Sequence, residues 1–251
     1  MKSPDVVDEK SVERCARLIE EANSIAVLTG AGISTAAGIP DFRGPQGLYV
    51  TRKYDPDKVF DIRAFYEDPA PFFTFAKDFL ELERTIKPTF THRFLAELEK
   101  RGKLRGVVTQ NIDSLHQLAG VKNVLELHGS FWQSHCTECG HEYTFEETKK
   151  KVVDEFIPRC DCQGVIKPDI VFFGENVKRL DEAFRLAQEA DLFFVIGTSC
   201  VVYPAAMVPQ YADGKIAVVN QSDIALDLPN TVLTVKEDID HFFRKVSQYE
   251  T

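Results

Sequence analysis

The chain has 251 residues, a hydrophobic content of 44%, and 39 acidic against 30 basic side chains, which gives a net charge of −9. This length suits one large α/β domain, or one domain that carries a smaller module. The acidic balance disfavours a basic surface for direct nucleic-acid binding, and no stretch is long and apolar enough to cross a membrane.

The first elements follow from the spacing of apolar residues. An amphipathic helix is predicted over residues 11–22, where apolar side chains recur at helical spacing. The apolar run at 24–28 ends in a glycine turn, which is typical of a buried parallel strand. Two more helices are predicted over 69–86 and 89–100, the second capped by one of two threonines near its start.

Strands and helices alternate through most of the remaining chain. We predict strands over 105–108, 124–127, 166–173, 192–196 and 215–219, and helices over 181–190 and 237–247. Residues 132–165 are rich in Cys, His and charged residues and look like an inserted module. The alternation predicts a parallel sheet that helices cover on both faces.

Polar or glycine clusters follow the ends of five apolar strands, after Leu28, Val108, Leu127, Ile196 and Val219. In open parallel sheets, ligands bind at the carboxyl ends of the strands, so these clusters could line one crevice. Turns at strand ends would by themselves account for the glycines. They do not readily account for the polar side chains, which are Gln110, Asn111, Asp113 and His128.

The glycine turn at residues 30–34, Gly-Ala-Gly-Ile-Ser, follows the first strand and precedes a predicted helix. Glycines in this place let the backbone approach a pyrophosphate, and the N–H groups of a helix start can bind it. The third glycine of the usual dinucleotide fingerprint falls at Gly38, outside the standard spacing. By itself, this segment leaves nucleotide binding open.

The next segment, Ser-Thr-Ala-Ala-Gly-Ile-Pro-Asp-Phe-Arg-Gly at 34–44, closely resembles the sirtuin family, and the resemblance extends along almost all of the chain. Family motifs occur in order: Gly-Ala-Gly-Ile-Ser (30–34), Gly-Ile-Pro-Asp-Phe-Arg-Gly (38–44), Thr-Gln-Asn-Ile-Asp (109–113), Leu-His-Gly (127–129), the cysteine quartet, Val-Phe-Phe-Gly-Glu (171–175), Gly-Thr-Ser (197–199), Val-Tyr-Pro-Ala (202–205) and Val-Val-Asn (218–220). The resemblance implies an NAD-dependent protein-lysine deacylase.

The resemblance also implies a reaction sequence. The acyl oxygen of a modified lysine attacks C1′ of the nicotinamide ribose, and nicotinamide leaves. His128 matches the family's general base, and it then deprotonates a ribose hydroxyl that attacks the resulting imidate. The products are free lysine, nicotinamide and O-acyl-ADP-ribose, so the enzyme is a transferase in its chemistry and a hydrolase-like deacetylase in its outcome.

Asn111 and Asp113 join His128 as catalytic candidates by this resemblance. The Asn amide can orient a ribose hydroxyl or a water, and Asp113 would hold the nicotinamide carboxamide. All positions that the resemblance assigns to NAD binding are Gly30, Ala31, Gly32, Ser34, Thr35, Asp41, Phe42, Arg43, Gln110, Asn111, Ile112, Asp113, His128, Gly197, Thr198, Ser199, Asn220, Asp238 and Ile239. Phe42 would shield the reactive ribose, and Asp41 and Arg43 could alternatively form a loop salt bridge.

Four of the six cysteines cluster: Cys136, Cys139, Cys160 and Cys162. Residues 1–10 lack the apolar run of a signal peptide, so we expect a cytoplasmic protein, where disulfides are rare and such clustering indicates metal. Four thiolates suit a closed, structural Zn²⁺ site. Sirtuins usually have two or more residues between the last two cysteines, so three side chains are alternative ligands: His135, His141 and Asp161.

Two segments resemble those between which sirtuins hold an acyl-lysine peptide as an added strand. The substrate-side candidates are Val171, Phe173, Gly174, Glu175, Val202 and Tyr203. Relatives that prefer succinyl-lysine carry a Tyr and an Arg three residues apart, where this chain has Ala76 and Phe79. A buried carboxylate without a cationic partner is costly, so we expect acetyl and longer neutral acyl groups.

We therefore predict one sirtuin-type catalytic domain over 1–251, built as an α/β, doubly wound Rossmann-like parallel sheet with a smaller inserted zinc-binding module and a helical flap. The Rossmann-like part takes approximately 8–44, 88–131 and 166–251, and the small module 45–87 and 132–165. We expect a monomer. A protein mono-ADP-ribosyltransferase and a non-catalytic NAD or peptide sensor are the alternatives.

Overall fold

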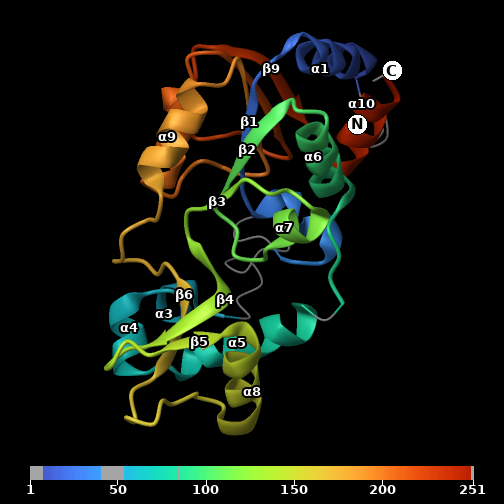
Figure 1. Cartoon of the computed structure of the whole chain (residues 1–251). Coiled ribbons are helices and arrows are strands. Elements are labelled where there is room, and N and C mark those ends of the chain that lie inside the picture. The colour runs from blue at the N-terminus through green and yellow to red at the C-terminus, as the bar shows by residue number, and fades with distance from the viewer. Residues whose placement is uncertain (1–7, 41–53, 84, 250–251) are drawn as a thin grey trace.

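A computed structural model describes residues 8–40, 54–83 and 85–249 (Figure 1). The NAD-binding positions predicted at Asp41, Phe42 and Arg43 lie outside the described residues. In the described part of the chain, no helix combines the length and the apolar content of a membrane span.

Within the described residues, the larger sheet has six strands in the order β3-β2-β1-β7-β8-β9, and every neighbouring pair is parallel. The strands are β1 (Ile25–Thr29), β2 (Leu104–Thr109), β3 (Val124–Glu126), β7 (Leu192–Ile196), β8 (Lys215–Asn220) and β9 (Thr231–Lys236). The chain adds β2 and β3 on one side of β1 and the later strands on the other, so the strand order reverses between β1 and β7. This confirms the predicted doubly wound sheet.

The edge strand β9 is absent from the sequence-based prediction. Only Leu233 and Val235 are buried in it, at alternating positions, while the preceding and following residues are half-buried or exposed. The predicted strands are continuous apolar runs, which indicate burial on both faces. A half-exposed edge strand gives a much weaker signal.

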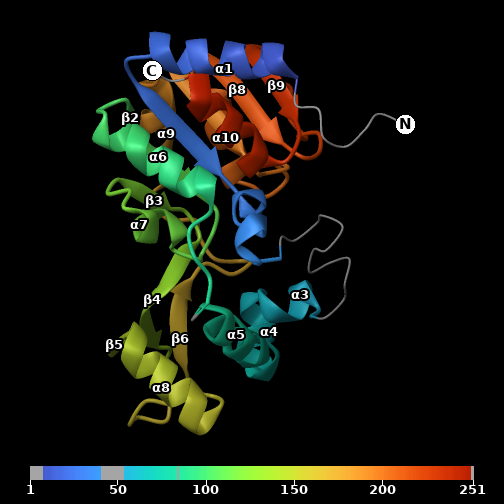
Figure 2. The same cartoon turned by 90° about the vertical axis from the view of Figure 1, so that its right-hand side faces the viewer.

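Helices cover both faces of the larger sheet (Figure 2). One face carries α1 (Glu9–Glu21), α6 (Phe90–Lys100) and α10 (Ile239–Tyr249), and the other carries α9 (Leu180–Gln188) and η3 (Ala205–Tyr211). The side chains of β1 point alternately into the two hydrophobic clusters, one on each face of the sheet. Ile25 and Val27 pack in the first cluster, and Ala26 and Leu28 in the second, all fully buried.

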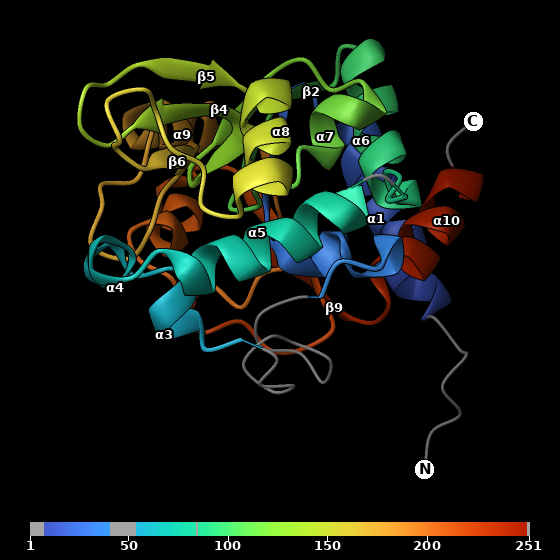
Figure 3. The same cartoon turned by 90° about the horizontal axis from the view of Figure 1, so that it is seen from below.

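The smaller part combines a second sheet with helices on one side (Figures 1 and 3). Its strands, in the order β5-β4-β6, are β4 (Gly129–Cys136), β5 (Glu142–Thr144) and β6 (Ile166–Ile170). Its helices are α3 (Pro56–Val59), α4 (Ile62–Glu67), α5 (Ala70–Glu83) and α8 (Phe145–Glu155). Phe65, Phe72, Phe73 and Phe172 dominate the core between them. The sequence predicts a zinc-bearing module too small to build its own core, whereas helices of the flap and strands of the small sheet share this apolar core.

The strand β6 belongs to the smaller part, although the division predicted from the sequence places its residues in the Rossmann-like part. The sequence division assigns residues 166–170 to the Rossmann-like part, whereas β6 pairs antiparallel with β4 in the small sheet. β4 also starts at Gly129, before the predicted start of the module at residue 132. An apolar run identifies a buried strand, but it does not identify the sheet that buries it.

Candidate functional site

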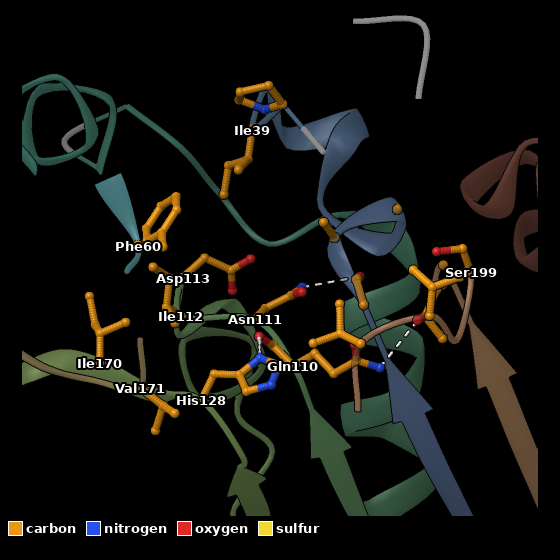
Figure 4. Close-up of a pocket in the computed structure, with 18 of the residues that line it drawn as sticks. Ile39, Phe60, Gln110, Asn111, Ile112, Asp113, His128, Ile170, Val171 and Ser199 are labelled. Atoms are coloured by element: carbon orange, nitrogen blue, oxygen red, sulfur yellow. Dashed lines mark hydrogen bonds between the residues drawn. The ribbon is translucent and has the colours of Figure 1, made fainter. Parts of the chain in front are cut away.

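A cavity of about 940 Å³ lies between the two parts, along the carboxyl ends of β1, β2, β7 and β8 (Figure 4). Polar and glycine residues of the larger sheet form one wall, and phenylalanines of the flap and the segment after β6 form the other. This is the crevice that the polar strand ends predict, at the point where the strand order reverses.

The structure places most of the predicted residues on this one cavity. From the predicted NAD set it is lined by Gly30, Ala31, Gly32, Thr35, Gln110, Asn111, Ile112, Asp113, His128, Gly197, Thr198, Ser199, Asn220 and Ile239. From the predicted peptide-side set it is lined by Val171, Phe173, Gly174, Glu175, Val202 and Tyr203. The cavity also has lining residues that the sequence did not single out, among them Tyr54, Phe60, Leu82, Gln221 and Ser222.

Two predicted NAD positions do not line the cavity. Asp238 is exposed, and its carboxylate accepts a 2.7 Å hydrogen bond from the backbone N–H of His241, at the start of α10. Its side chain therefore caps a helix, and its assignment to NAD binding near the adenine stays a prediction. Ser34 is fully buried behind the wall, where its hydroxyl supports the polar side chains in front of it.

The glycine turn after β1 packs directly on the turn after β7. Gly30 N–H donates to the carbonyl of Ile196 at 3.0 Å, and Gly32 N–H donates to the carbonyl of Gly197 at 2.8 Å. A Cβ at Gly32 would lie 2.8 Å from the Cα of Gly197, so a side chain would separate the two turns. In place of the long helix expected after this turn, two short 3₁₀ helices follow: η1 (Ala31–Ile33) and η2 (Thr35–Ala37).

Asn111, Asp113 and Ser34 form one buried hydrogen-bonded network. Ser34 Oγ donates to Asp113 Oδ2 at 2.6 Å, and Asn111 Nδ2 donates to Ser34 Oγ and to the Gly30 carbonyl, each at 3.2 Å. Burial raises the pKa of Asp113, and the hydrogen bond from Ser34 works in the opposite direction. The network fixes both side chains before any ligand binds.

Asp113 also begins the segment that leads into α7 (Leu115–Ala119). Its Oδ1 accepts a 2.9 Å hydrogen bond from Leu115 N–H. Both carboxylate oxygens are therefore engaged, which holds the side chain in one orientation at the cavity wall.

His128 lies between the end of β3 in the larger sheet and the start of β4 in the smaller sheet. Its Nδ1 lies 2.8 Å from the carbonyl oxygen of Gln110 (Figure 4). A carbonyl only accepts, so Nδ1 carries the proton and the neutral ring keeps its lone pair on Nε2. Burial lowers the pKa of His128, and the bond to Gln110 partly offsets this. The neutral imidazole needed for proton abstraction is thus favoured.

The backbone on both sides of His128 is also fixed. Gly129 has a φ of +67°, and a Cβ there would collide with the carbonyl oxygen of Asp169. Val171 N–H donates to the His128 carbonyl at 2.8 Å, which ties the segment after β6 to the same residue. The glycine of the Leu-His-Gly motif thereby lets the two segments meet without steric conflict.

A pair of buried histidines lies behind the network. The rings of His92 on α6 and His116 on α7 are 4.6 Å apart between centroids, and His116 Nε2 lies 2.9 Å from Thr29 Oγ1 at the end of β1. His92 Nδ1 accepts from Thr89 N–H at 3.3 Å and completes the capping box of α6. Burial lowers the pKa of His92 to about 3 and that of His116 well below its ordinary value.

We expect this pair to make the protein less stable in mild acid. Below about pH 6.5 the unfolded chain takes up protons at both histidines while the folded chain does not, so the free energy of unfolding falls with pH by about 1.4 kcal/mol per pH unit for each. His92→Asn keeps an acceptor for Thr89 N–H and removes one titrating ring. Urea unfolding at pH 6.5 and 5.5 should show a smaller loss for His92→Asn than for wild type.

The exposed His241 on α10 provides the matched control. As a control for the substitution itself, His241→Asn should unfold at the same urea concentration as wild type at pH 6.5. Equal losses of stability for wild type and His92→Asn would show that the pair does not titrate on unfolding as its burial requires.

The four predicted metal ligands come together in the smaller part. The Sγ atoms of Cys136, Cys139, Cys160 and Cys162 all lie within 4.8 Å of one another. The contacts Cys136–Cys162 and Cys139–Cys160 are 3.4 and 3.6 Å. Tetrahedral Zn–S bonds of about 2.3 Å separate sulfurs by about 3.8 Å, so the four thiolates fit a zinc ion. The group does not include the alternative ligands His135, His141 and Asp161.

The short segment between the last two cysteines closes as a tight turn. Cys160 N–H donates to the Gly164 carbonyl at 2.9 Å, and Gln163 N–H donates to the Cys160 carbonyl at 2.8 Å. Gln163 adopts a φ of +72°, so the chain reverses within a few residues. Because of this turn, the thiols of Cys160 and Cys162 both reach the cysteine cluster, even though only Asp161 lies between the two residues in the sequence.

Comparisons with known proteins agree with this geometry. A family model described as the Sir2 family matches residues 30–204. An NAD-dependent protein deacetylase of Thermotoga maritima is 44% identical over 239 residues, covering 92% of this chain and 95% of its own. NAD-dependent protein deacetylase 1 of Pyrobaculum aerophilum is 46% identical over 222 residues, with 86% of each chain covered.

Solved structures are similar over the whole domain. A Sir2 structure with a p53 peptide and NAD⁺ superposes with a TM-score of 0.85 at 42% identity, covering 94% of this chain and 96% of that one. A Sir2 structure bound to a propionylated peptide has a TM-score of 0.84 at 40% identity, covering 94% and 97%.

Proposed function

The chain belongs to the Sir2 family, and on that premise we propose that it removes acyl groups from protein lysine side chains in an NAD-dependent reaction. The observation that carries the proposal is the position of His128. Its ring lines the same cavity as Asn111 and Asp113 on one wall and the peptide-side segments on the other. The products are free lysine, nicotinamide and O-acyl-ADP-ribose, and one water is consumed.

NAD is the co-substrate, and the lining of the cavity suits its parts. The pyrophosphate can approach the backbone closely at Gly30 and Gly32, and Thr198 supplies a hydroxyl beside them. Asn220 and Ile239 line the same cavity, and we assign them to the adenosine by their match to the family. At the other end, Asp113 receives the nicotinamide carboxamide, whose amide N–H groups are donors for a carboxylate.

His128 is the general base in this proposal. With its proton on Nδ1 held by the Gln110 carbonyl, Nε2 accepts the proton of a ribose hydroxyl once nicotinamide has left. That hydroxyl then attacks the acyl carbon, so the acyl group passes from the lysine to the ribose. Asn111 orients the reacting hydroxyl or a water, since its amide is fixed by Gly30 and Ser34.

The acyl-lysine peptide pairs as an added strand between the segments at 171–175 and 202–205. Phe173 and Tyr203 are 44% and 60% exposed although they line the cavity, which supports an open groove at this face. Backbone pairing accepts many sequences, so specificity for flanking residues is loose. Zn²⁺ has a structural role, because four thiolates leave no coordination position for a substrate.

The decisive test follows an acetyl-lysine peptide and nicotinamide together. With NAD present, the peptide should lose the mass of its acetyl group while nicotinamide appears in equal amount, and without NAD neither should change. ADP-ribose attached to protein with no loss of acetyl would favour a mono-ADP-ribosyltransferase. No turnover with retained binding would favour an NAD or peptide sensor. The monomeric state and the cytoplasmic location stay predictions, as does the division into two parts outside β4 and β6.

We expect acetylated and longer neutral acyl-lysine to be preferred over succinyl-lysine. Ala76 and Phe79 are both buried in α5, and Phe79 lines the apolar end of the cavity with Phe60 and Leu82. On matched peptides, kcat/KM should favour acetyl over succinyl by about 100-fold or more; a higher value for succinyl would overturn the assignment of this end of the cavity.

A further inference from the structure

A buried lysine lies behind the peptide-side segment and takes no part in the steps above. Lys167 on β6 is 2% exposed. An ammonium group is expensive to bury unless it is paired and hydrogen-bonded, so the fold must give it partners. Those partners belong to the last residue of β6 and to the segment that follows it.

Three partners surround the Lys167 ammonium. Nζ donates to the Ile170 carbonyl at 2.7 Å and pairs with Glu175 Oε2 at 3.0 Å. It also lies 4.2 Å from the centroid of the Phe172 ring, in cation–π contact. A lysine has three N–H donors, and Ile170 and Glu175 in this short stretch of chain accept from two of them.

The same contacts close the turn that lines the peptide side of the cavity. Glu175 Oε2 accepts from Phe172 N–H at 2.8 Å, and Glu175 N–H donates to the Phe172 carbonyl at 3.0 Å. Lys167 thus fixes the position of the Glu175 carboxylate, and this carboxylate stabilises the turn through its hydrogen bond with Phe172 N–H. Within the turn, Phe173 N–H donates to the Phe60 carbonyl at 2.7 Å, which links the turn to the segment between α3 and α4.

We propose that Lys167 is a positioning residue for the acyl-lysine peptide: it fixes the turn 172–175 against β6 and so sets the affinity for the peptide, not for NAD. This inference rests on the proposed function. None of the contacts of Lys167 reaches the glycine turn or the Asn111–Asp113 network on the opposite wall. A loosened turn should therefore weaken peptide binding selectively, because the added strand would have to order its partner as it binds.

Lys167→Met tests this directly. Methionine keeps the length of the side chain and its contact with Phe172, but it removes the ammonium. For an acetyl-lysine peptide, we expect KM and the Kd from fluorescence anisotropy to rise about tenfold or more, with the KM for NAD within about twofold of wild type. Lys167→Arg keeps the charge and should recover part of the peptide affinity.

Lys178 offers a matched control. It also pairs with a carboxylate, that of Asp169, and donates to the Asp169 carbonyl at 3.2 Å, but its side chain is 36% exposed and these hydrogen-bonding partners lie in β6, not in the turn 172–175. Lys178→Met should leave both KM values as in wild type. Zinc content and thermal unfolding of each variant verify that it is folded.

Unchanged peptide KM and Kd in folded Lys167→Met would overturn the inference, as would equal losses for peptide and NAD. If Lys167→Met does not fold, Glu175→Gln replaces it, since Gln still accepts from Phe172 N–H while the ion pair is lost. It should weaken peptide binding about threefold or more with NAD unaffected. A wild type that binds the peptide but does not deacylate it refutes only the proposed function; one that does not bind it refutes both.

Discussion

His128→Ala should lower kcat for lysine deacylation by about 10²–10⁴-fold while the protein keeps its affinity for NAD and for an acetyl-lysine peptide. Alanine removes the Nε2 lone pair that the Gln110 carbonyl fixes on the ring through the 2.8 Å contact of Nδ1. The neighbouring Asn111 and Asp113 are held by Ser34 and Gly30, not by the imidazole, so the rest of the wall should persist. Single-turnover release of deacylated peptide and separate binding measurements check both halves of this result.

His241→Ala is the control for this experiment, because His241 is exposed on α10. It should deacylate like wild type. If His128→Ala retained wild-type turnover, another group would have to be the base, and the proposed role of the imidazole would be wrong. If His128→Ala lost NAD and peptide binding along with turnover, the lower turnover would result from a disrupted cavity wall and not from the missing proton acceptor.

The pH profile gives the same proposal a second consequence. The base is the neutral imidazole, so activity is lost as pH falls through the pKa of His128. Burial lowers that pKa, which puts the acid limb of kcat below about pH 6.5, the ordinary value for a histidine. An acid limb well above that value would mean that a different group, or a charged His128, limits the reaction.

Local patterns in the sequence were enough to predict which polar residues come together at the cavity and which cysteines cluster. Gln110, Asn111 and His128 could be found because polar side chains at the ends of apolar strands have no packing reason to be there, and parallel strands bring their carboxyl ends together. The cysteine pairs could be found because metal geometry requires close spacing in pairs. In both cases a local pattern already carries the chemistry.

What the sequence missed depends on contacts between distant segments. β6 reads as a buried strand, but its partner is β4, which only the fold determines. The sequence also does not show that the Asp238 carboxylate binds the N–H of His241 at the start of α10. The sequence around Lys167 gives no sign of its role. Its side chain is buried beneath the turn at 172–175, and its ion-pair partner, Glu175, lies eight residues further along the chain.

Removal of the zinc ion should unfold the zinc-binding end of the smaller part, which comprises β5 and the turn at 160–164, and abolish deacylation. The cluster around the site has only Cys136, Cys160 and Ile166 as buried members, with Tyr143 partly buried against it, so little hydrophobic burial holds β5 and the turn at 160–164 in place. Structural zinc sites contribute apparent binding free energies of about 10–16 kcal/mol at neutral pH. The fold of this zinc-binding end should therefore depend on the metal. Zinc analysis of the purified protein should give one ion per chain, and chelation should remove activity together with the native unfolding transition.

Cys162→Ser separates the role of the fourth ligand from a general effect of chelators. Its thiol lies 3.4 Å from that of Cys136, so its loss opens the thiolate shell and should lower both zinc occupancy and the melting temperature. Cys15→Ala is the matched control, because Cys15 is fully buried in α1 within the larger core and is not one of the clustered thiols. It should keep one zinc ion per chain. Full occupancy and activity in Cys162→Ser would mean that the short Cys160-Asp161-Cys162 segment does not supply two ligands, and a neighbour such as His141 would then have to complete the site.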